Sequence, residues 1–87
     1  MSNVRELSQV DRLALFMRES VGVDGEATIQ EMYAEMQGYN GQRGYERYSR
    51  RMQQRVGGVV SRINKKLNGM RIVPGERKRT YRLIKTA

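Results

Sequence analysis

One stretch, residues 45–68, limits what this chain can fold into more than any other. Its apolar residues recur mainly at steps of three and four, which is typical of one side of an α-helix. They are Met52, Val56, Val59, Val60, Ile63 and Leu67. At about 100° per residue, cationic and hydrogen-bonding residues fall on the opposite side. These are Arg47, Arg50, Arg51, Gln54, Gly58, Ser61 and Lys65. We therefore expect a helix that buries an apolar stripe and presents its polar side to a groove lined by phosphates and base edges.

Two adjacent glycines, Gly57 and Gly58, interrupt this helical pattern. Each costs about 1 kcal/mol relative to alanine inside a helix. Either the helix breaks there and a shorter one runs from about Gly58 to Leu67, or the missing side chains allow close approach of the first helix or of nucleic acid. We favour one continuous or kinked helix with the glycines at a close contact.

Charge is divided unevenly along the chain. The net charge is +8, and residues 1–42 hold three basic and seven acidic residues, whereas residues 43–87 hold fourteen basic and two acidic ones. The second half is therefore expected to meet a polyanion; the alternative is a basic protein that is merely soluble. The acidic residues of the first half are expected to face away from that polyanion, towards solvent or a protein partner. They include Glu19, Asp24, Glu26, Glu31 and Glu35.

Several classes of function are disfavoured by composition. The chain has no cysteine and no histidine, so it lacks thiolate ligands and the commonest general base and metal ligand. It also lacks a phosphate-cradling glycine loop of the usual spacing. We expect no enzyme activity, no metal and no cofactor. The sequence shows no apolar run near the roughly 18 residues of a membrane span and no signal-peptide core, so we expect a cytoplasmic, nucleoid-associated protein away from membranes.

Two shorter helices are predicted ahead of the basic one. The first spans residues 4–20, where apolar residues follow three-and-four spacing, and Ser8 with Asp11 offers an alternative, later start. A short strand over residues 26–28 follows. The second helix begins at the capping box Thr28-Ile29-Gln30-Glu31, in which hydroxyl and carboxylate each satisfy a backbone N–H.

A β-hairpin is predicted after the basic helix. Met70 and Ile72, then Tyr81 and Leu83, alternate with polar residues, and Pro74-Gly75 marks the turn. The order of elements is helix, short strand, helix, basic helix and basic hairpin. This order predicts one α+β domain over residues 1–87, a small winged helix with three helices and a C-terminal hairpin as its wing.

Two segments resemble the response-regulator effector domains of the OmpR/PhoB type. They are Val60-Ser61-Arg62-Ile63-Asn64-Lys65-Lys66-Leu67 and Thr80-Tyr81-Arg82-Leu83, and the resemblance covers residues 56–84. It implies that Ser61, Arg62 and Lys65 face the major groove, and that residues 77–79 form a wing that reaches the minor groove or the backbone. This chain departs from the pattern in having Thr80 where the family has glycine and Asn64 where it has arginine, and we expect no receiver domain in front.

These patterns predict a sequence-specific regulator of transcription that binds double-stranded DNA. The expected DNA-binding residues are Arg43, Arg47, Arg50, Arg51, Gln54, Arg55, Gly58, Ser61, Arg62, Lys65, Lys66, Arg77, Lys78 and Arg79. The small size favours a regulator from a phage or another mobile element, acting as a homodimer on paired half-sites. The alternatives are an RNA-binding or ribosome-associated protein and a small inhibitor that binds a host protein.

Overall fold

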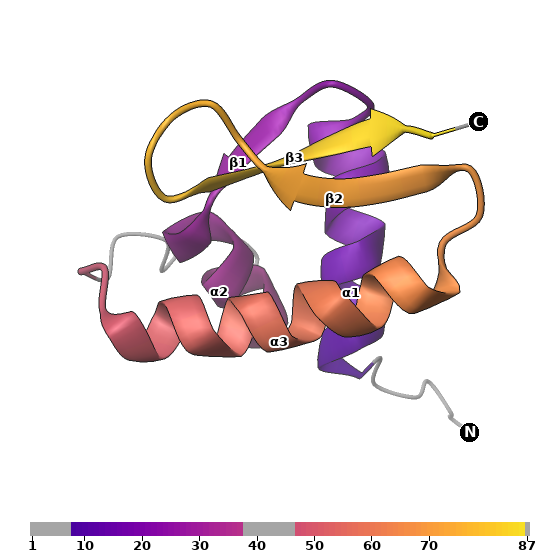
Figure 1. Ribbon diagram of the computed structural model, residues 1–87. Coiled ribbons are helices and arrows are strands. Elements are labelled where there is room, and N and C mark those ends of the chain that lie inside the picture. Colours follow the sequence, from indigo (N-terminus) through magenta and orange to yellow (C-terminus); the bar gives the residue numbers. More distant parts are fainter. Residues whose placement is uncertain (1–7, 38–46, 87) are drawn as a thin grey trace.

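The computed structural model describes residues 8–37 and 47–86. In this part of the chain the elements follow the predicted order (Figure 1). They are α1 (Gln9–Leu15), which continues into the π-helical turn η1 (Phe16–Val21), β1 (Glu26–Thr28), α2 (Ile29–Gln37), α3 (Arg50–Lys66), β2 (Met70–Pro74) and β3 (Thr80–Lys85). The described residues thus form an α+β fold, with three α-helices and a three-stranded antiparallel sheet, and its layout is consistent with a small winged helix.

Side-chain caps fix where the first two helices begin. The Ser8 hydroxyl oxygen accepts a hydrogen bond from the Asp11 N–H at 3.1 Å, so the later of the two predicted starts is the one observed. Residues 4–7 lie outside the described part. At α2 the Thr28 hydroxyl accepts from the Glu31 N–H at 3.0 Å, and the Glu31 carboxylate accepts from the Thr28 N–H at 2.9 Å. The predicted capping box is confirmed, and it satisfies N–H groups that the helix leaves unpaired.

The long helix α3 starts later than the predicted stretch, residues 45–68. The Ser49 side chain caps it by accepting from the Met52 N–H at 3.2 Å, and the first helical residue is Arg50. The prediction that Arg47 lies on this helix was therefore wrong, because the helix begins only after the Ser49 cap, beyond Arg47 in the chain. The predicted apolar stripe is confirmed. Its buried members are Met52, Val56, Val59, Val60 and Ile63, and Leu67 is the half-buried C-cap.

The glycine pair does not break α3, which is helical through both residues. A Cβ built at Gly57 would lie 3.7 Å from the Tyr81 hydroxyl, an ordinary van der Waals distance, and one built at Gly58 would meet no described atom within 4 Å. The favoured continuous helix is confirmed. Close packing against the first helix is not the reason for the glycines, since neither position approaches α1 so closely.

The sheet has the order β1-β3-β2, so the last strand is its centre. Ala27 of β1 pairs with Tyr81, and Ile72 of β2 pairs with Leu83. The short strand at residues 26–28 and the hairpin are thereby confirmed. Leu83 of the central strand also bonds to the segment before β1. The Leu83 N–H donates to the Gly25 carbonyl at 3.3 Å, and the Leu83 carbonyl accepts from the Asp24 N–H at 2.6 Å.

A side chain of α3 completes the outer edge of β2. The Asn64 amide donates to the Ile72 carbonyl at 2.9 Å, and its oxygen accepts from the Ile72 N–H at 2.8 Å. An asparagine thus occupies the place of a neighbouring strand and satisfies two backbone groups on the edge of the sheet. This is the physical role of the residue that stands where the OmpR/PhoB pattern has arginine.

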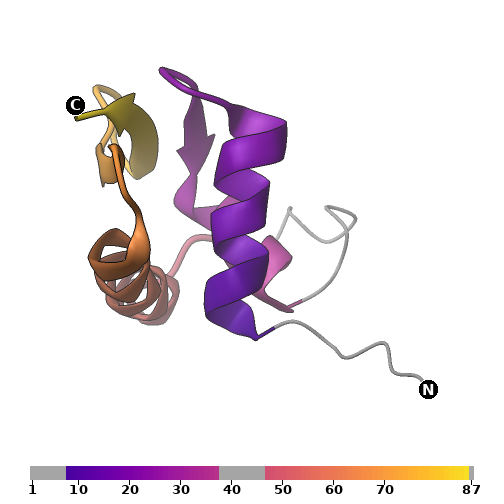
Figure 2. The same cartoon turned by 90° about the vertical axis from the view of Figure 1, so that its right-hand side faces the viewer.

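One apolar core joins the helices to the sheet. Figure 2 shows α3 and the hairpin on one side of the molecule and α1 on the other. The buried residues between them are Leu13, Met17, Ala27, Ile29, Met32, Met36, Met52, Val56, Val59, Val60, Ile63, Ile72 and Leu83. Since α3 is buried only along its stripe, its other side remains available to solvent.

Candidate nucleic-acid interface

The solvent side of α3 is an uninterrupted polar surface, which we call the α3 cationic face. Its exposed members are Arg50, Arg51, Gln54, Arg55, Gly58, Ser61, Arg62, Lys65 and Lys66. The helix contains no acidic residue. At about 100° per residue these positions cover an arc of about 160°, with Gly58 at its middle. The apolar stripe thus fixes which way the cations point, because it must face the core.

The loop of the hairpin, residues 75–79, and the beginning of α3 lie at the same end of the molecule (Figure 1). We call residues 75–79 the wing loop. The Arg79 guanidinium sits over the ring of Tyr48 at 3.7 Å from the ring centroid, a cation–π contact, and Tyr48 in turn donates its hydroxyl proton to Gln53 on the first turn of α3. The wing loop and the start of the α3 cationic face are therefore held next to each other.

Two of the expected wing cations already have partners within the protein. Arg77 forms an ion pair with Glu26 through Nε and Oε1 at 3.3 Å, and Arg79 stacks on Tyr48. Lys78 is exposed and has no ion-pair partner among the described residues. The three cations share one loop, as predicted, but only Lys78 is without such a partner there.

The Glu26 carboxylate organises the wing loop. It accepts from the Glu76 N–H at 3.2 Å as well as from Arg77. These bonds favour the charged form of Glu26 and lower its pKa, although burial acts in the opposite direction. The Glu76 N–H has the largest effect, and Arg77 and Thr80 add to it. A side chain at Gly75 would collide with the Thr80 hydroxyl and press on Glu26, so the tight turn also needs glycine at that position.

Two acidic residues of the first half lie next to cations of the hairpin, and whether the acidic residues face away from a polyanion stays a prediction. Glu26 contacts Arg77, and Asp24 lies 3.9 Å from Arg82, because β1 and the segment before it lie along the central strand of the basic hairpin. Charge counting along the sequence could not place these carboxylates. Their position follows from a strand pairing between residues more than fifty positions apart.

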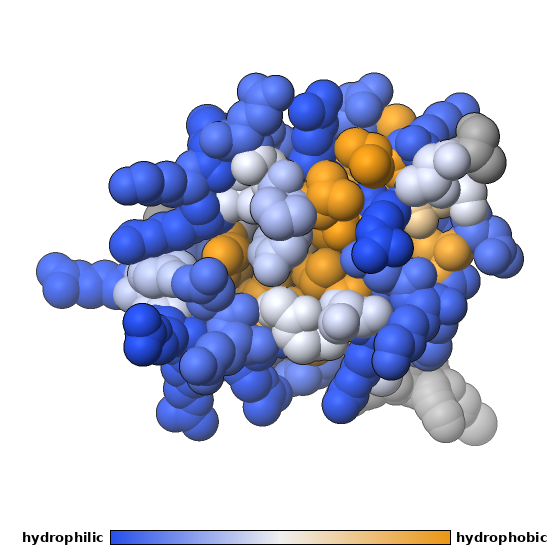
Figure 3. Space-filling view, in the orientation of Figure 1, coloured by the Kyte–Doolittle hydropathy of each residue, from blue (hydrophilic) through white to orange (hydrophobic). Residues whose placement is uncertain are grey.

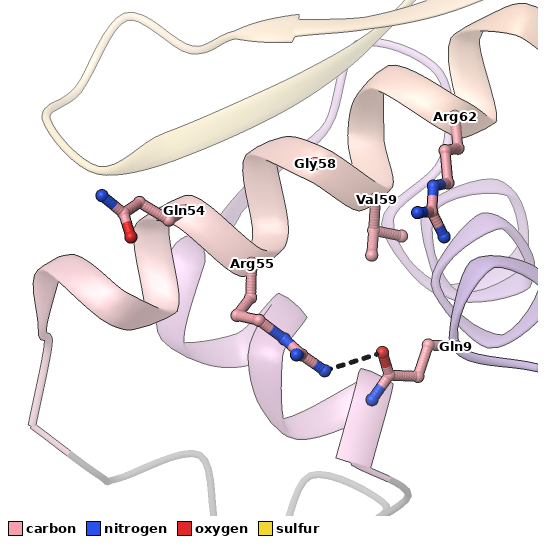
Figure 4. Close-up of a pocket in the computed structure, with 6 residues that line it drawn as sticks. All are labelled: Gln9, Gln54, Arg55, Gly58, Val59 and Arg62. Atoms are coloured by element: carbon pink, nitrogen blue, oxygen red, sulfur yellow. Dashed lines mark hydrogen bonds between the residues drawn. The ribbon is translucent and has the colours of Figure 1, made fainter.

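A hollow of about 250 Å³ opens between α3 and the first residue of α1. It is lined by Gln9, Gln54, Arg55, Gly58, Val59 and Arg62. Arg55 donates from Nη2 to the Gln9 side-chain oxygen at 3.2 Å (Figure 4). Gln9 was not among the predicted site residues. No local pattern marks it, since the contact joins residues 46 positions apart.

The surface around these elements is mostly hydrophilic. Figure 3 shows hydrophilic side chains around the face that carries α3 and the hairpin, with apolar surface between the two. Of the predicted DNA-binding residues, the structure gathers those of α3 on one face and those of residues 77–79 on the adjacent loop. Arg47 is exposed just before α3, and Arg43 lies outside the described residues.

Within residues 8–37 and 47–86, no group of three or more His, Cys, Asp or Glu side chains is placed to hold a metal ion. No helix of that part is long and apolar enough to cross a membrane. Comparison of the chain with protein-family models, curated proteins and solved structures found no match. The resemblance to OmpR/PhoB-type effector domains therefore stays a prediction from residues 56–84.

Proposed function

We propose that this protein is a winged-helix regulator of transcription that binds double-stranded DNA in a sequence-specific way. The α3 cationic face is the observation that carries the proposal: it is exposed, continuous over four turns and free of carboxylates. A helix with its side chains is about 10–12 Å across, and the major groove of B-DNA is about 12 Å wide. In this proposal α3 enters the major groove.

The position of each residue around α3 suggests which residues contact bases and which contact phosphates. Gln54, Ser61 and Lys65 lie on the half of the arc away from α1 and are proposed to reach base edges; glutamine suits adenine by bidentate geometry. Arg50, Arg51 and Lys66 are proposed to pair with phosphates, which position a protein on the duplex without reading its sequence. Arg55 and Arg62 lie towards α1.

The hairpin is proposed to act as the wing, on the minor groove or the phosphate backbone. Support comes from the Arg79–Tyr48 contact, which keeps the wing loop beside α3 so that one duplex can meet both. Lys78 is the cation of that loop best able to contact a phosphate, because Arg77 and Arg79 are engaged within the protein.

One helix and one wing cover only a few base pairs. We therefore include a homodimer on two half-sites in the proposal, with half-sites one helical turn or a multiple of it apart. A nucleoid-associated location and a role in a phage or another mobile element also belong to the proposal.

Selection from a pool of random duplexes, followed by fluorescence anisotropy on the enriched sequence, tests the proposal. We expect a preferred sequence, and affinity that falls on the order of a thousandfold between 50 and 200 mM salt if about six phosphates are neutralised. Equal affinity for enriched and random duplexes would remove sequence specificity. Tighter binding to a structured RNA of the same length would replace the DNA proposal with the RNA-binding alternative.

A further inference from the structure

The residues that line the hollow between α1 and α3 are either cationic or neutral. Two guanidinium groups and two side-chain amides line it, together with Gly58 and Val59, and there is no carboxylate among them. A guanidinium carries five N–H donors and no acceptor. In the described part of the chain, Arg55 directs one of its nitrogens to Gln9, and the Arg62 side chain has no hydrogen-bond partner. The site is thus rich in positive donors, and no carboxylate among its lining residues pairs with them.

The lining residues of α3 have the spacing of a single helix face. Arg55, Gly58 and Arg62 are three and four residues apart, so the two arginines are separated by two turns, about 10 Å along the axis. Figure 4 shows the Arg55 and Arg62 side chains extending to the side where Gln9 lies, with Val59 between them, whereas Gln54 extends away. The two guanidinium groups therefore border the same space.

We propose that this hollow binds one phosphate group of the DNA strand that runs past α1. This inference rests on the proposed function and adds a contact that brings α1 into the interface. Arg62 and the remaining donors of Arg55 pair with the phosphate oxygens, as guanidinium groups do in charge-assisted, often bidentate, hydrogen bonds. The Gln9 oxygen orients Arg55, and the Gln9 amide N–H donates to the phosphate.

Gly58 contributes by leaving space. No described atom lies within 4 Å of a Cβ built there, so the opening of the hollow towards the middle of α3 is not filled by the protein. A strand can therefore approach the helix backbone while its phosphate sits between the arginines. Contacts of this kind fix the position of a protein on the duplex and carry no sequence information directly.

The first test is Gln9→Glu, which keeps the side-chain size and the acceptor for Arg55 but puts a carboxylate into the hollow. We expect the fold to be retained, because the introduced carboxylate can pair with Arg55. Affinity for duplex DNA is expected to fall about tenfold, equally for preferred and random sequences. Arg62→Gln, measured in parallel, should weaken binding equally for both and reduce the slope of log K against log salt by about 0.9.

Arg18→Gln is the matched control. It also changes the net charge by −1, on an exposed residue of η1 at the opposite end of the same helical stretch from Gln9. Its affinity and salt slope should remain those of the wild type. Circular dichroism melting of all three variants shows whether any loss of binding comes from a loss of folding.

Three results would overturn the phosphate contact. If both Gln9→Glu and Arg62→Gln keep the wild-type affinity and salt slope, the hollow does not bind a DNA phosphate, and the proposed function is unaffected. A loss for Arg62→Gln confined to sites with one particular base would assign Arg62 to a base edge. Saturable shifts of the Arg62 side-chain NMR signals with inorganic phosphate or a mononucleotide at sub-millimolar concentration would make a free phosphate the ligand. The proposed function fails separately, when the wild type itself prefers no duplex.

Discussion

Replacing Gly58 with alanine should stabilise the protein and weaken its binding to DNA. The residue lies inside α3, where alanine is favoured over glycine by about 1 kcal/mol. Its missing Cβ has no described neighbour within 4 Å, so nothing in that part of the fold opposes the added methyl group. For a domain of this size, 1 kcal/mol corresponds to a rise in Tm of roughly 4–8 °C.

The expected effect on binding has the opposite sign, because Gly58 is at the middle of the α3 cationic face. If the duplex packs against the helix there, a methyl group must be accommodated in a filled interface. Overpacking of that kind typically costs about 1–3 kcal/mol, which corresponds to roughly a 5- to 150-fold increase in Kd. A substitution that merely damaged the fold would lower both Tm and affinity.

Gly57→Ala is the matched control for this experiment. It makes the same change one residue earlier, where the new Cβ would lie at an ordinary 3.7 Å from the Tyr81 hydroxyl, towards the hairpin and away from the middle of the cationic face. We expect a similar rise in Tm and unchanged binding. Thermal unfolding and anisotropy with the preferred duplex measure both quantities. A Gly58→Ala variant that binds as well as the wild type would refute close approach of DNA at the middle of α3.

Three further predictions concern the hairpin and its supports. Asn64→Ala removes two hydrogen bonds to β2, so we expect thermal unfolding to show a loss of stability of about 1–3 kcal/mol. Asn68 is exposed in the following turn, and the control Asn68→Ala should leave stability unchanged. The pKa of Glu26 is lowered by folding, so its contribution to stability is present above the pKa of the unfolded chain and is lost as pH falls through the folded value. An NMR titration should give a midpoint below the ordinary glutamate value of 4.5, together with a shift of the Glu76 N–H, and a higher midpoint would contradict these bonds. Lys78→Gln should lower the salt slope by about 0.9 without changing Tm, and an unchanged slope would exclude Lys78 from the interface.

Local sequence patterns were sufficient for the elements whose formation depends on near neighbours. The capping box at Thr28 and Glu31 is satisfied by atoms three residues apart, and the stripe on α3 follows from helical periodicity. The alternation around Ile72 and Leu83, with a proline and glycine between, is likewise enough to define a hairpin. The polar side of α3 could also be predicted from the sequence, because a helix that buries one side against the core exposes the other.

The placement of Glu26, Asn64 and Gln9 was decided by tertiary structure alone. Glu26 reaches the wing loop through the pairing of β1 with the central strand, Asn64 occupies the edge of β2, and Gln9 meets Arg55 across 46 residues. The sequence by itself determined that this chain has a basic, exposed helix and a basic hairpin. Which carboxylates neutralise the hairpin, and which end of α1 borders the helix, depend on contacts between distant residues, and no periodicity or capping rule encodes those.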